Sequence, residues 1–401
     1  MTIQQLYPTT RPSLDLNFAR TKRLDPRVTF TRGSTATYVG SDGLIKTAVT
    51  NEARFDHDPA TGESLGLLVE EARTNYVTDN NQVLLAVTNS TTSSAPGVDG
   101  VATSGSRITS IAAGVASARN ATNRTIFWPN SSYTVWSFYV KPENTTATSI
   151  TLSAVAGSGA GGATFDWSTL TTTINGANAL SASIKAMGNG WYYCSVNYNN
   201  TLSGTTGYRM EFTFTAGGAG DTVSLYGNQV EVGSFPTSYI PTSGSTVTRS
   251  ADVASMTGTG FSSWWSASTG TFQANFRAKL SGTRPVLSVD DNTANNRIEL
   301  YTSTSSQKFT VTTSGAAQAD ITAGTASSTA INSQSAVYGS NDFSTSLNGA
   351  AAVTDTSGTV PVVTQLRIGA DQAGNTTAVP IARLTYYPTR LTDAQLQALT
   401  L

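Results

Sequence analysis

The sequence has little charge. Only 12% of its 401 residues are Asp, Glu, Lys or Arg, about half the share in a typical globular protein. The formal net charge of −1 provides no field that would attract nucleic acid or an anionic membrane surface. We therefore expect no nucleic-acid partner.

Cysteine and histidine are almost absent, with one Cys194 and one His57. A single cysteine excludes an intramolecular disulfide, and the two residues lie too far apart in sequence to indicate a zinc site. Cys194 lies in the strand-like run WYYCSV, so we expect a buried, inert thiol. His57 lies in the turn-like run DHDP, so we expect a loop residue rather than a catalytic base.

Long apolar runs are also missing. No stretch approaches the roughly 20 residues of a membrane helix, and the first twenty residues lack the apolar run of a secretory signal. We therefore expect a protein made in a cytoplasm, with no membrane insertion and no export by that route.

Small polar residues take the place of the missing charges. Ser, Thr, Asn, Ala and Gly suit exposed strands and turns rather than long surface helices. The apolar share of 38% suffices for packed domains. A chain of this length is long for one core, so we expect two or three domains.

The charges that are present gather near the start. Residues 1–80 hold nine basic and ten acidic residues, 19 of the 49 in the chain. Mixed charges with few long apolar runs suggest a segment ordered by its neighbours through ion pairs and backbone hydrogen bonds. An ordinary charged N-terminal subdomain is the open alternative.

The middle of the chain reads as all-β. Tyr208, Met210, Phe212 and Phe214 alternate with polar residues, which predicts a strand with one face in a core. Residues 132–140 (SYTVWSFYV) are rich enough in aromatic and β-branched types to be covered on both faces.

Three glycine-containing signals punctuate this region. The pairs Asn175-Gly176 and Asn189-Gly190 suit the positive-φ positions of two-residue hairpins. The run GSGAGG at 157–162 resembles a dinucleotide loop, but a strand-like segment follows it instead of a helix, so we interpret it as a flexible turn.

The last third continues the β pattern. Apolar residues from Phe272 to Leu280 alternate with polar ones, predicting a half-buried strand, and Asn348-Gly349 predicts a hairpin. Only the end looks helical, because Thr392 and Gln395 have capping-box spacing. Leu391 and Leu396 are placed as the accompanying hydrophobic staple. The predicted fold class is therefore all-β: a charged N-terminal segment (1–85), then two β-sandwiches (86–253 and 254–401).

No catalytic constellation is visible. The 15 acidic residues beyond position 80 are scattered singly, apart from Asp290-Asp291, and adjacent strand residues point to opposite faces. Without a later histidine, a Ser-His-Asp hydrolase in the sandwiches is excluded. We predict that the protein is not an enzyme and has no catalytic residues. A lyase using Tyr and Arg, or an acid pair assembled across subunits, stays open.

The sequence does not define a metal or cofactor site either. Asp290, Asp291 and Asn292, with Asn295 and Asn296, carry the oxygens that calcium prefers, but a solvated Asp/Asn turn is the favoured interpretation. We therefore predict no cofactor and no metal, with calcium as the alternative.

Sugar-binding aromatic side chains cannot be singled out either. Trp264 and Trp265 are expected to pack against the last sandwich, and Trp128 is the more accessible candidate. The ligand-binding residues are therefore unknown.

Several phrases resemble known proteins. The stretches at 30–48 and 54–75 resemble one found near the start of many phage and prophage tail or virion proteins. Those at 188–196 and 226–253 resemble the carbohydrate-binding-like jelly roll that follows it. Residues 383–400 are similar to the last strand and helix of concanavalin A-like lectin domains.

This resemblance implies a structural component of a tailed-phage virion, made in the host cytoplasm. It implies first a tail fibre or spike with modules that bind host surface glycans, assembled as a homotrimer or another cyclic oligomer. Residues 1–85 would attach to other virion proteins. The alternatives are a capsid decoration, head-fibre or tail-reinforcing protein and, less favoured, a polysaccharide depolymerase. The resemblance implies neither the position on the particle nor the host or glycan.

Overall fold

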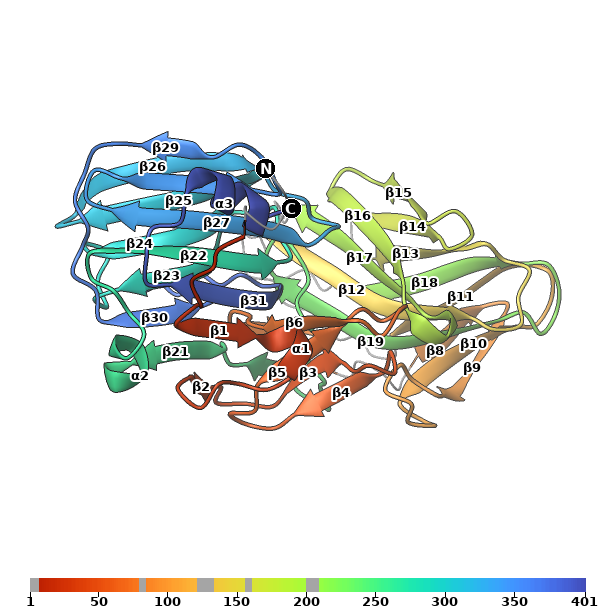
Figure 1. Ribbon diagram of the computed structural model, residues 1–401. Coiled ribbons are helices and arrows are strands. Elements are labelled where there is room, and N and C mark those ends of the chain that lie inside the picture. Colours follow the sequence, from red (N-terminus) through yellow and green to blue (C-terminus); the bar gives the residue numbers. More distant parts are fainter. Residues whose placement is uncertain (1–6, 79–83, 121–132, 156–160, 200–208) are drawn as a thin grey trace.

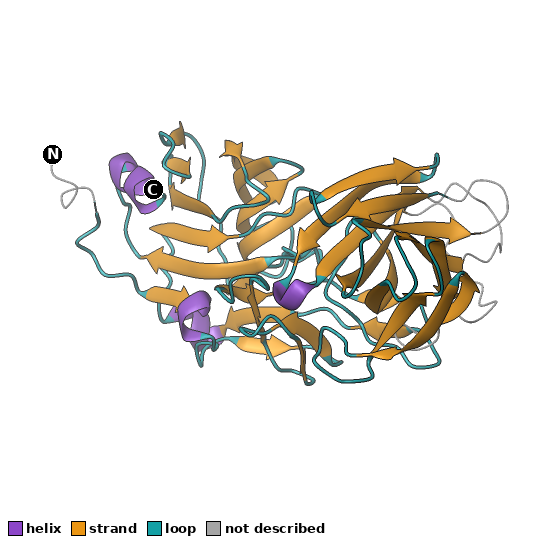
Figure 2. Cartoon of the chain, turned by 90° about the vertical axis from the view of Figure 1, so that its right-hand side faces the viewer, coloured by secondary structure: helices purple, strands orange, loops and turns teal. Residues whose placement is uncertain are grey.

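The computed structural model describes residues 7–78, 84–120, 133–155, 161–199 and 209–401. These residues form two β-sandwich lobes arranged along one axis (Figure 1). The helices are short and lie outside the sheets (Figure 2). Among the described residues, no helix has the length and apolar character needed to cross a membrane. The predicted all-β class with two sandwiches is confirmed.

The middle sandwich consists of two six-stranded antiparallel sheets. In order across the first sheet, the strands are β16 (Ala179–Ala186), β17 (Tyr192–Asn199), β12 (Tyr133–Pro142), β19 (Thr222–Val232), β10 (Gly105–Ser110) and β9 (Ser90–Ala95). Across the second they are β15 (Thr171–Asn175), β14 (Gly162–Asp166), β13 (Ser149–Val155), β18 (Arg209–Ala216), β11 (Gly114–Asn120) and β8 (Leu84–Thr88). A core rich in aromatic side chains, including Trp136, Phe138 and Phe212, fills the space between them.

The C-terminal sandwich packs an eight-stranded sheet on a seven-stranded one. The larger has the order β29 (Val353–Asp355), β28 (Phe343–Leu347), β27 (Asn332–Gly339), β22 (Thr269–Phe276), β31 (Pro380–Tyr387), β6 (Ser64–Leu68) and β5 (Arg54–His57), with β1 (Leu14–Asn17) also paired to β31. The smaller has the order β2 (Thr29–Thr31), β21 (Val253–Thr257), β30 (Gln365–Ile368), β23 (Thr283–Asp290), β24 (Arg297–Ser303), β25 (Ser306–Thr313) and β26 (Ala316–Thr325).

The remaining elements are small. Two strand pairs complete the sheets: β3 (Ala36–Val39) with β4 (Ile45–Ala48), and β7 (Arg73–Asn75) with β20 (Val247–Arg249). The helices are α1 (Phe18–Thr21), the 3-10 turn η2 (Gly188–Gly190), α2 (Gly258–Ser262) and α3 (Asp393–Leu399).

The N-terminal segment shares its core with the C-terminal sandwich. Leu16, Phe30 and Leu67 lie in the same buried cluster as Phe272 and Leu384. Its strands extend both sheets of that lobe, as the red and orange ribbons along the blue lobe show (Figure 1). The segment is therefore ordered by its neighbours, as one of the two alternatives predicted. Attachment to other virion proteins through residues 1–85 stays a prediction.

A buried ion-pair network, which we call the arginine network, joins this segment to the residues that connect the lobes. Its members are Arg32, Arg54, Glu70, Arg249 and Asp252, all almost fully buried. Arg54 lies 2.7 Å from Glu70 and also contacts Asp252. Asp252 lies 3.0 Å from Arg32, and Glu70 lies 2.8 Å from Arg249. Three guanidiniums thus share two carboxylates, which is the arrangement that makes burial of such charges tolerable.

The strand predictions are confirmed in the middle sandwich, for strands β18 and β12. In β18, Met210, Phe212 and Phe214 are buried while Glu211 and Thr213 are half-exposed, which confirms the alternation. Strand β12 is buried along most of its length on both faces, as predicted. Tyr208 and residues 157–160 of the glycine-rich run lie outside the described residues.

The alternation predicted through Leu280 is partly wrong. Strand β22 ends at Phe276, Gln273 is buried, and Leu280 is exposed beyond the strand. Gln273 donates to Ser333 on the neighbouring strand, and the Ser333 hydroxyl in turn donates to the Leu399 carbonyl. The second face of β22 is therefore covered by the end of the chain rather than by solvent.

Two of the three predicted Asn-Gly hairpins are confirmed. Asn189-Gly190 and Asn348-Gly349 both have positive φ angles, and they join antiparallel neighbours, β16 to β17 and β28 to β29. The hairpin predicted at Asn175-Gly176 is wrong, because β15 and β16, which this turn connects, belong to opposite sheets of the middle sandwich. The turn there carries the chain from one layer to the other.

The terminal helix forms as predicted. Thr392 and Gln395 make both hydrogen bonds of the capping box. Leu391 and Leu396 lie together in a small cluster with Val337 and Tyr387 on the outside of the eight-stranded sheet.

Of the predictions for the single cysteine and the single histidine, one is confirmed and the other is wrong. Cys194 is buried in the middle core as expected, and burial raises the pKa of its thiol well above the ordinary value. The loop assignment of His57 is wrong, because it ends strand β5 and is only 6% exposed, with Nδ1 3.0 Å from the Val39 carbonyl. The turn signal around it belongs to the next residues, where Asp58 accepts from the Ala60 amide.

Candidate functional site

The outer face of the seven-stranded sheet carries a row of polar side chains. Along β24, Ile298 and Leu300 point into the core, and Arg297, Glu299 and Tyr301 therefore point to the opposite face. This face is open to solvent around a hollow of about 390 Å³. We call this hollow the β24 groove.

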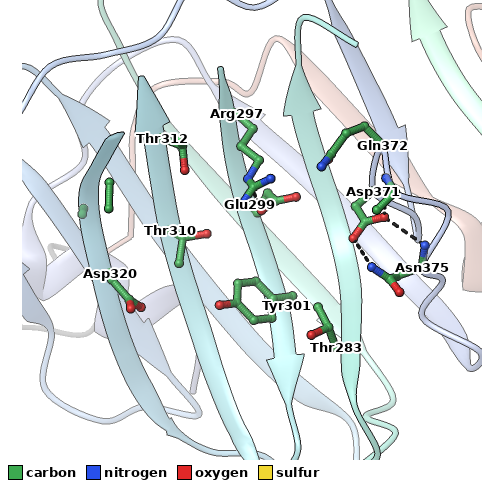
Figure 3. Close-up of a pocket in the computed structure, with 13 residues that line it drawn as sticks. Thr283, Arg297, Glu299, Tyr301, Thr310, Thr312, Asp320, Asp371, Gln372 and Asn375 are labelled. Carbon is green, nitrogen blue, oxygen red and sulfur yellow. Dashed lines mark hydrogen bonds and ion pairs between the residues drawn. The ribbon is translucent and has the colours of Figure 1, made fainter. Parts of the chain in front are cut away.

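The β24 groove is formed by four neighbouring strands and one loop (Figure 3). Its lining combines hydroxyls, amides, carboxylates, one guanidinium and one aromatic ring: Thr283, Arg297, Glu299, Tyr301, Thr310, Thr312, Ala317, Ala319, Asp320, Asp371, Gln372, Ala373 and Asn375. Most of the members come from β23 to β26, and the last four come from the loop after β30.

That loop is held in shape by one carboxylate. Asp371 accepts hydrogen bonds from the amides of Ala373 and Asn375, both at 2.9 Å, and from the Asn375 side chain at 2.7 Å. These three bonds fix the wall of the groove before any ligand binds. The side-chain oxygen of Gln372, also in this wall, is shielded from solvent and accepts no hydrogen bond from the described residues.

The floor of the groove contains a shielded acid. Glu299 is 7% exposed and lies 2.9 Å from Arg297. Burial raises the pKa of Glu299 to about 7, and the charges of Asp371 and Asp290 add to this rise while Arg297 opposes it. Near neutral pH, Glu299 is therefore present in both its charged and its neutral form. The charged carboxylate accepts hydrogen bonds, and the neutral carboxylic acid can also donate one.

The aromatic member is Tyr301. It is half-buried, two residues beyond Glu299 on the same face of β24, and burial raises the pKa of its hydroxyl. On the rim, the exposed Asp320 lies 2.8 Å from Lys308. An aromatic ring beside several fixed hydrogen-bonding groups is the usual composition of a site that binds hydroxyl-rich molecules.

The sequence did not reveal this groove. The alternation of Arg297, Glu299 and Tyr301 was available as a sign of a solvent-facing row of polar residues. Nothing in the spacing indicated that Asp371 and Asn375, from a loop far along the chain, would form its wall.

The residues weighed from the sequence lie elsewhere. Trp264 is 3% exposed in the core of the C-terminal sandwich, and Trp265 stacks on Tyr338 with ring centroids 5.0 Å apart, so both pack as expected. Trp128 lies outside the described residues.

The Asp/Asn run forms the expected turn. Asp290 accepts from Gln365 and Arg367, and Asp291 accepts from Thr293 and Asn296. These oxygens already have donors. In the part of the chain that the structure describes, no group of three or more His, Cys, Asp or Glu side chains gathers as a metal site would require.

No known family profile matches the chain, and no curated protein matches it. Among solved structures, the chain is similar to the CBM40 module of a Ruminococcus gnavus IT-sialidase bound to α2,3-sialyllactose, with 17% identity over 35% of this chain and 88% of that one, and a TM-score of 0.31. Domains LG4-5 of the mouse laminin α1 chain match at 10% identity over 85% and 92%, with a TM-score of 0.25. A Trypanosoma rangeli sialidase in complex with sialic acid matches at 11% over 79% and 61%, with a TM-score of 0.28.

Proposed function

We propose that this protein is a structural component of a tailed-phage virion that binds host surface glycans through the β24 groove. The observation that carries the glycan part is the groove itself: a preformed hollow of about 390 Å³ on a sheet face, with Tyr301 beside the fixed polar groups of Glu299, Asp371 and Asn375. Such a mixture of one ring and several hydrogen-bonding groups suits a sugar, whose faces are apolar and whose edges are hydroxylated.

The virion part of the proposal is supported by the phrases in the sequence that resemble phage tail and virion proteins. A tail fibre or spike would place the groove where it meets the host surface, with residues 1–85 attached to other virion proteins. A homotrimer accompanies this role, and light scattering of the purified protein tests it. A stable monomer at micromolar concentration would contradict it.

Glycan binding is tested with the whole chain. Residues 86–401 alone would lack strands β1, β5 and β6, which complete the eight-stranded sheet, so a fragment would not be a fair probe. The measurement is binding to an array of bacterial surface oligosaccharides, followed by calorimetry on those that bind. Saturable binding is expected.

Two substitutions locate the binding site. Tyr301→Ala removes the ring from the groove and should weaken binding about tenfold, the equivalent of about 1.4 kcal/mol. Tyr133→Ala is the matched control, because Tyr133 is a 55% exposed aromatic on the middle sandwich, and it should leave binding unchanged. Absence of binding to the array, or equal loss in both variants, would refute a glycan site in the β24 groove.

The location on the particle needs a separate experiment. Gold-labelled antibody on intact virions should label the tail or its fibres. Label spread over the head would instead support the alternative role as a capsid decoration protein, and an unlabelled particle would remove the virion part of the proposal.

A further inference from the structure

The charges around the β24 groove are unequal in sign. Three carboxylates line it, those of Glu299, Asp320 and Asp371, against the single guanidinium of Arg297. Lys308, which is outside this lining, is bonded to Asp320 at 2.8 Å. With every group ionised the lining carries a net −2, and including Lys308 leaves it at −1.

The one guanidinium in the lining already has a carboxylate beside it. The Nε atom of Arg297 lies 2.9 Å from a carboxylate oxygen of Glu299. A ligand carboxylate bound to Arg297 would therefore lie close to the Glu299 carboxylate, and in the same lining it would also meet that of Asp371. Both contacts bring like charges together in a partly desolvated hollow, where their repulsion is stronger than in water.

The uncharged hydroxyl groups of a ligand would meet no such charge repulsion in the groove. The Asn375 side-chain oxygen and the Thr310 and Thr312 hydroxyls can each accept a hydrogen bond. The carboxylates accept from ligand hydroxyls as well, and these charge-assisted bonds are stronger than neutral ones. The lining thus offers mostly acceptors, which suits a ligand that presents donors.

On the basis of the proposed function, we infer that the β24 groove selects uncharged, hydroxyl-rich sugars and discriminates against sugars that carry a carboxylate. Glu299 and Asp320 are the residues that set this discrimination. Asp371 adds to it, but it also holds the loop in shape and is therefore unsuited to substitution.

The experiment compares sugars that differ by one charge. Each oligosaccharide found to bind on the array is tested as its neutral hexose form and as the form in which one primary alcohol is oxidised to a carboxylate. The hexose form should bind at least about tenfold more tightly. In Glu299→Gln and in Asp320→Asn this ratio should fall several-fold, chiefly because the oxidised form binds better.

Asp320→Asn protects the test against misfolding, because the Asp320 side chain is 59% exposed. Asp42→Asn is the control: Asp42 has a similarly exposed carboxylate, paired with Lys46 in the N-terminal segment, and its removal should leave the ratio unchanged. Equal or tighter binding of the oxidised form by the unmodified protein would overturn the inference while leaving glycan binding intact. Failure of every sugar to bind would overturn the proposed function, and the inference with it.

Discussion

The arginine network predicts a large and measurable loss of stability on removal of one charge. Glu70 accepts from Arg54 at 2.7 Å, from Arg249 at 2.8 Å, and from both the amide and the hydroxyl of Ser238. Burial alone would raise the pKa of Glu70, but the two arginines and these hydrogen bonds outweigh it and lower the pKa to about 2. Glu70→Gln keeps the shape of the side chain and removes its charge.

The magnitude follows from that pKa. The ordinary value is 4.5 and the folded value is about 2, and each pH unit corresponds to about 1.4 kcal/mol, so the charged form stabilises the fold by about 3 kcal/mol relative to the neutral one. Glu70→Gln should lower the free energy of unfolding in urea at pH 7 by about that amount. In the variant, Arg249 loses its ion pair and Asp252 is the one carboxylate left in the network, which is the costly case of an incompletely paired buried charge.

A pH series sharpens the test. A carboxylate whose pKa is lower in the folded than in the unfolded protein stabilises the fold fully above pH 4.5, and this contribution disappears as the pH falls toward 2. The stability difference between the unmodified protein and Glu70→Gln should therefore shrink over that interval. The control is Glu143→Gln, a partly exposed partner of Arg107, which should cost less than about 1 kcal/mol. A loss in Glu70→Gln no larger than in this control would refute the reasoning.

Four further outcomes are expected. Thr392→Ala removes the capping box of α3 and should cost about 1 kcal/mol in urea unfolding. Gly66→Ala should lower the melting temperature well below that of Gly114→Ala. Both positions have positive φ, but only the added Cβ at Gly66 would clash with a backbone oxygen, that of Ile381; equal effects would contradict this. Cys194 should stay unlabelled by a thiol reagent at pH 8 until the protein is unfolded, because its thiol is buried and its pKa raised. Lowering the pH from 8 to 6 should improve binding of carboxylated sugars, because Glu299, with its pKa near 7, becomes neutral in the groove; Glu299→Gln should abolish this dependence.

Local structure was predictable where it depends on neighbouring residues in the sequence. The period-two pattern around Phe212, the Asn348-Gly349 turn and the capping box of Thr392 each report the geometry of a few consecutive residues. The failures share a cause. The predicted exposure of Gln273 and the predicted hairpin at Asn175 were wrong, because both depend on contacts with segments that are distant in the sequence.

The same limit applies to the candidate site. Glu299 and Asp371 are single acidic residues in the sequence, and they face one groove only because the loop after β30 folds back over β24. The alternation along β24 indicates which face of the strand is polar, but it carries no information about the loop that turns this flat face into a hollow. Pairing between the segments of β1 and β31 was invisible for the same reason.

The pairing of β1 with β31 sets an order of events during synthesis. Asp15 and Arg383, which form an ion pair between these two strands, are 368 positions apart, so β1 is synthesised long before the strand that pairs with it. The middle sandwich, whose strands all lie between Leu84 and Val232, can close earlier. A product truncated before residue 380 would leave the edges of β1 and β22 unpaired and open to other nascent chains, an aggregation risk that the completed protein does not carry.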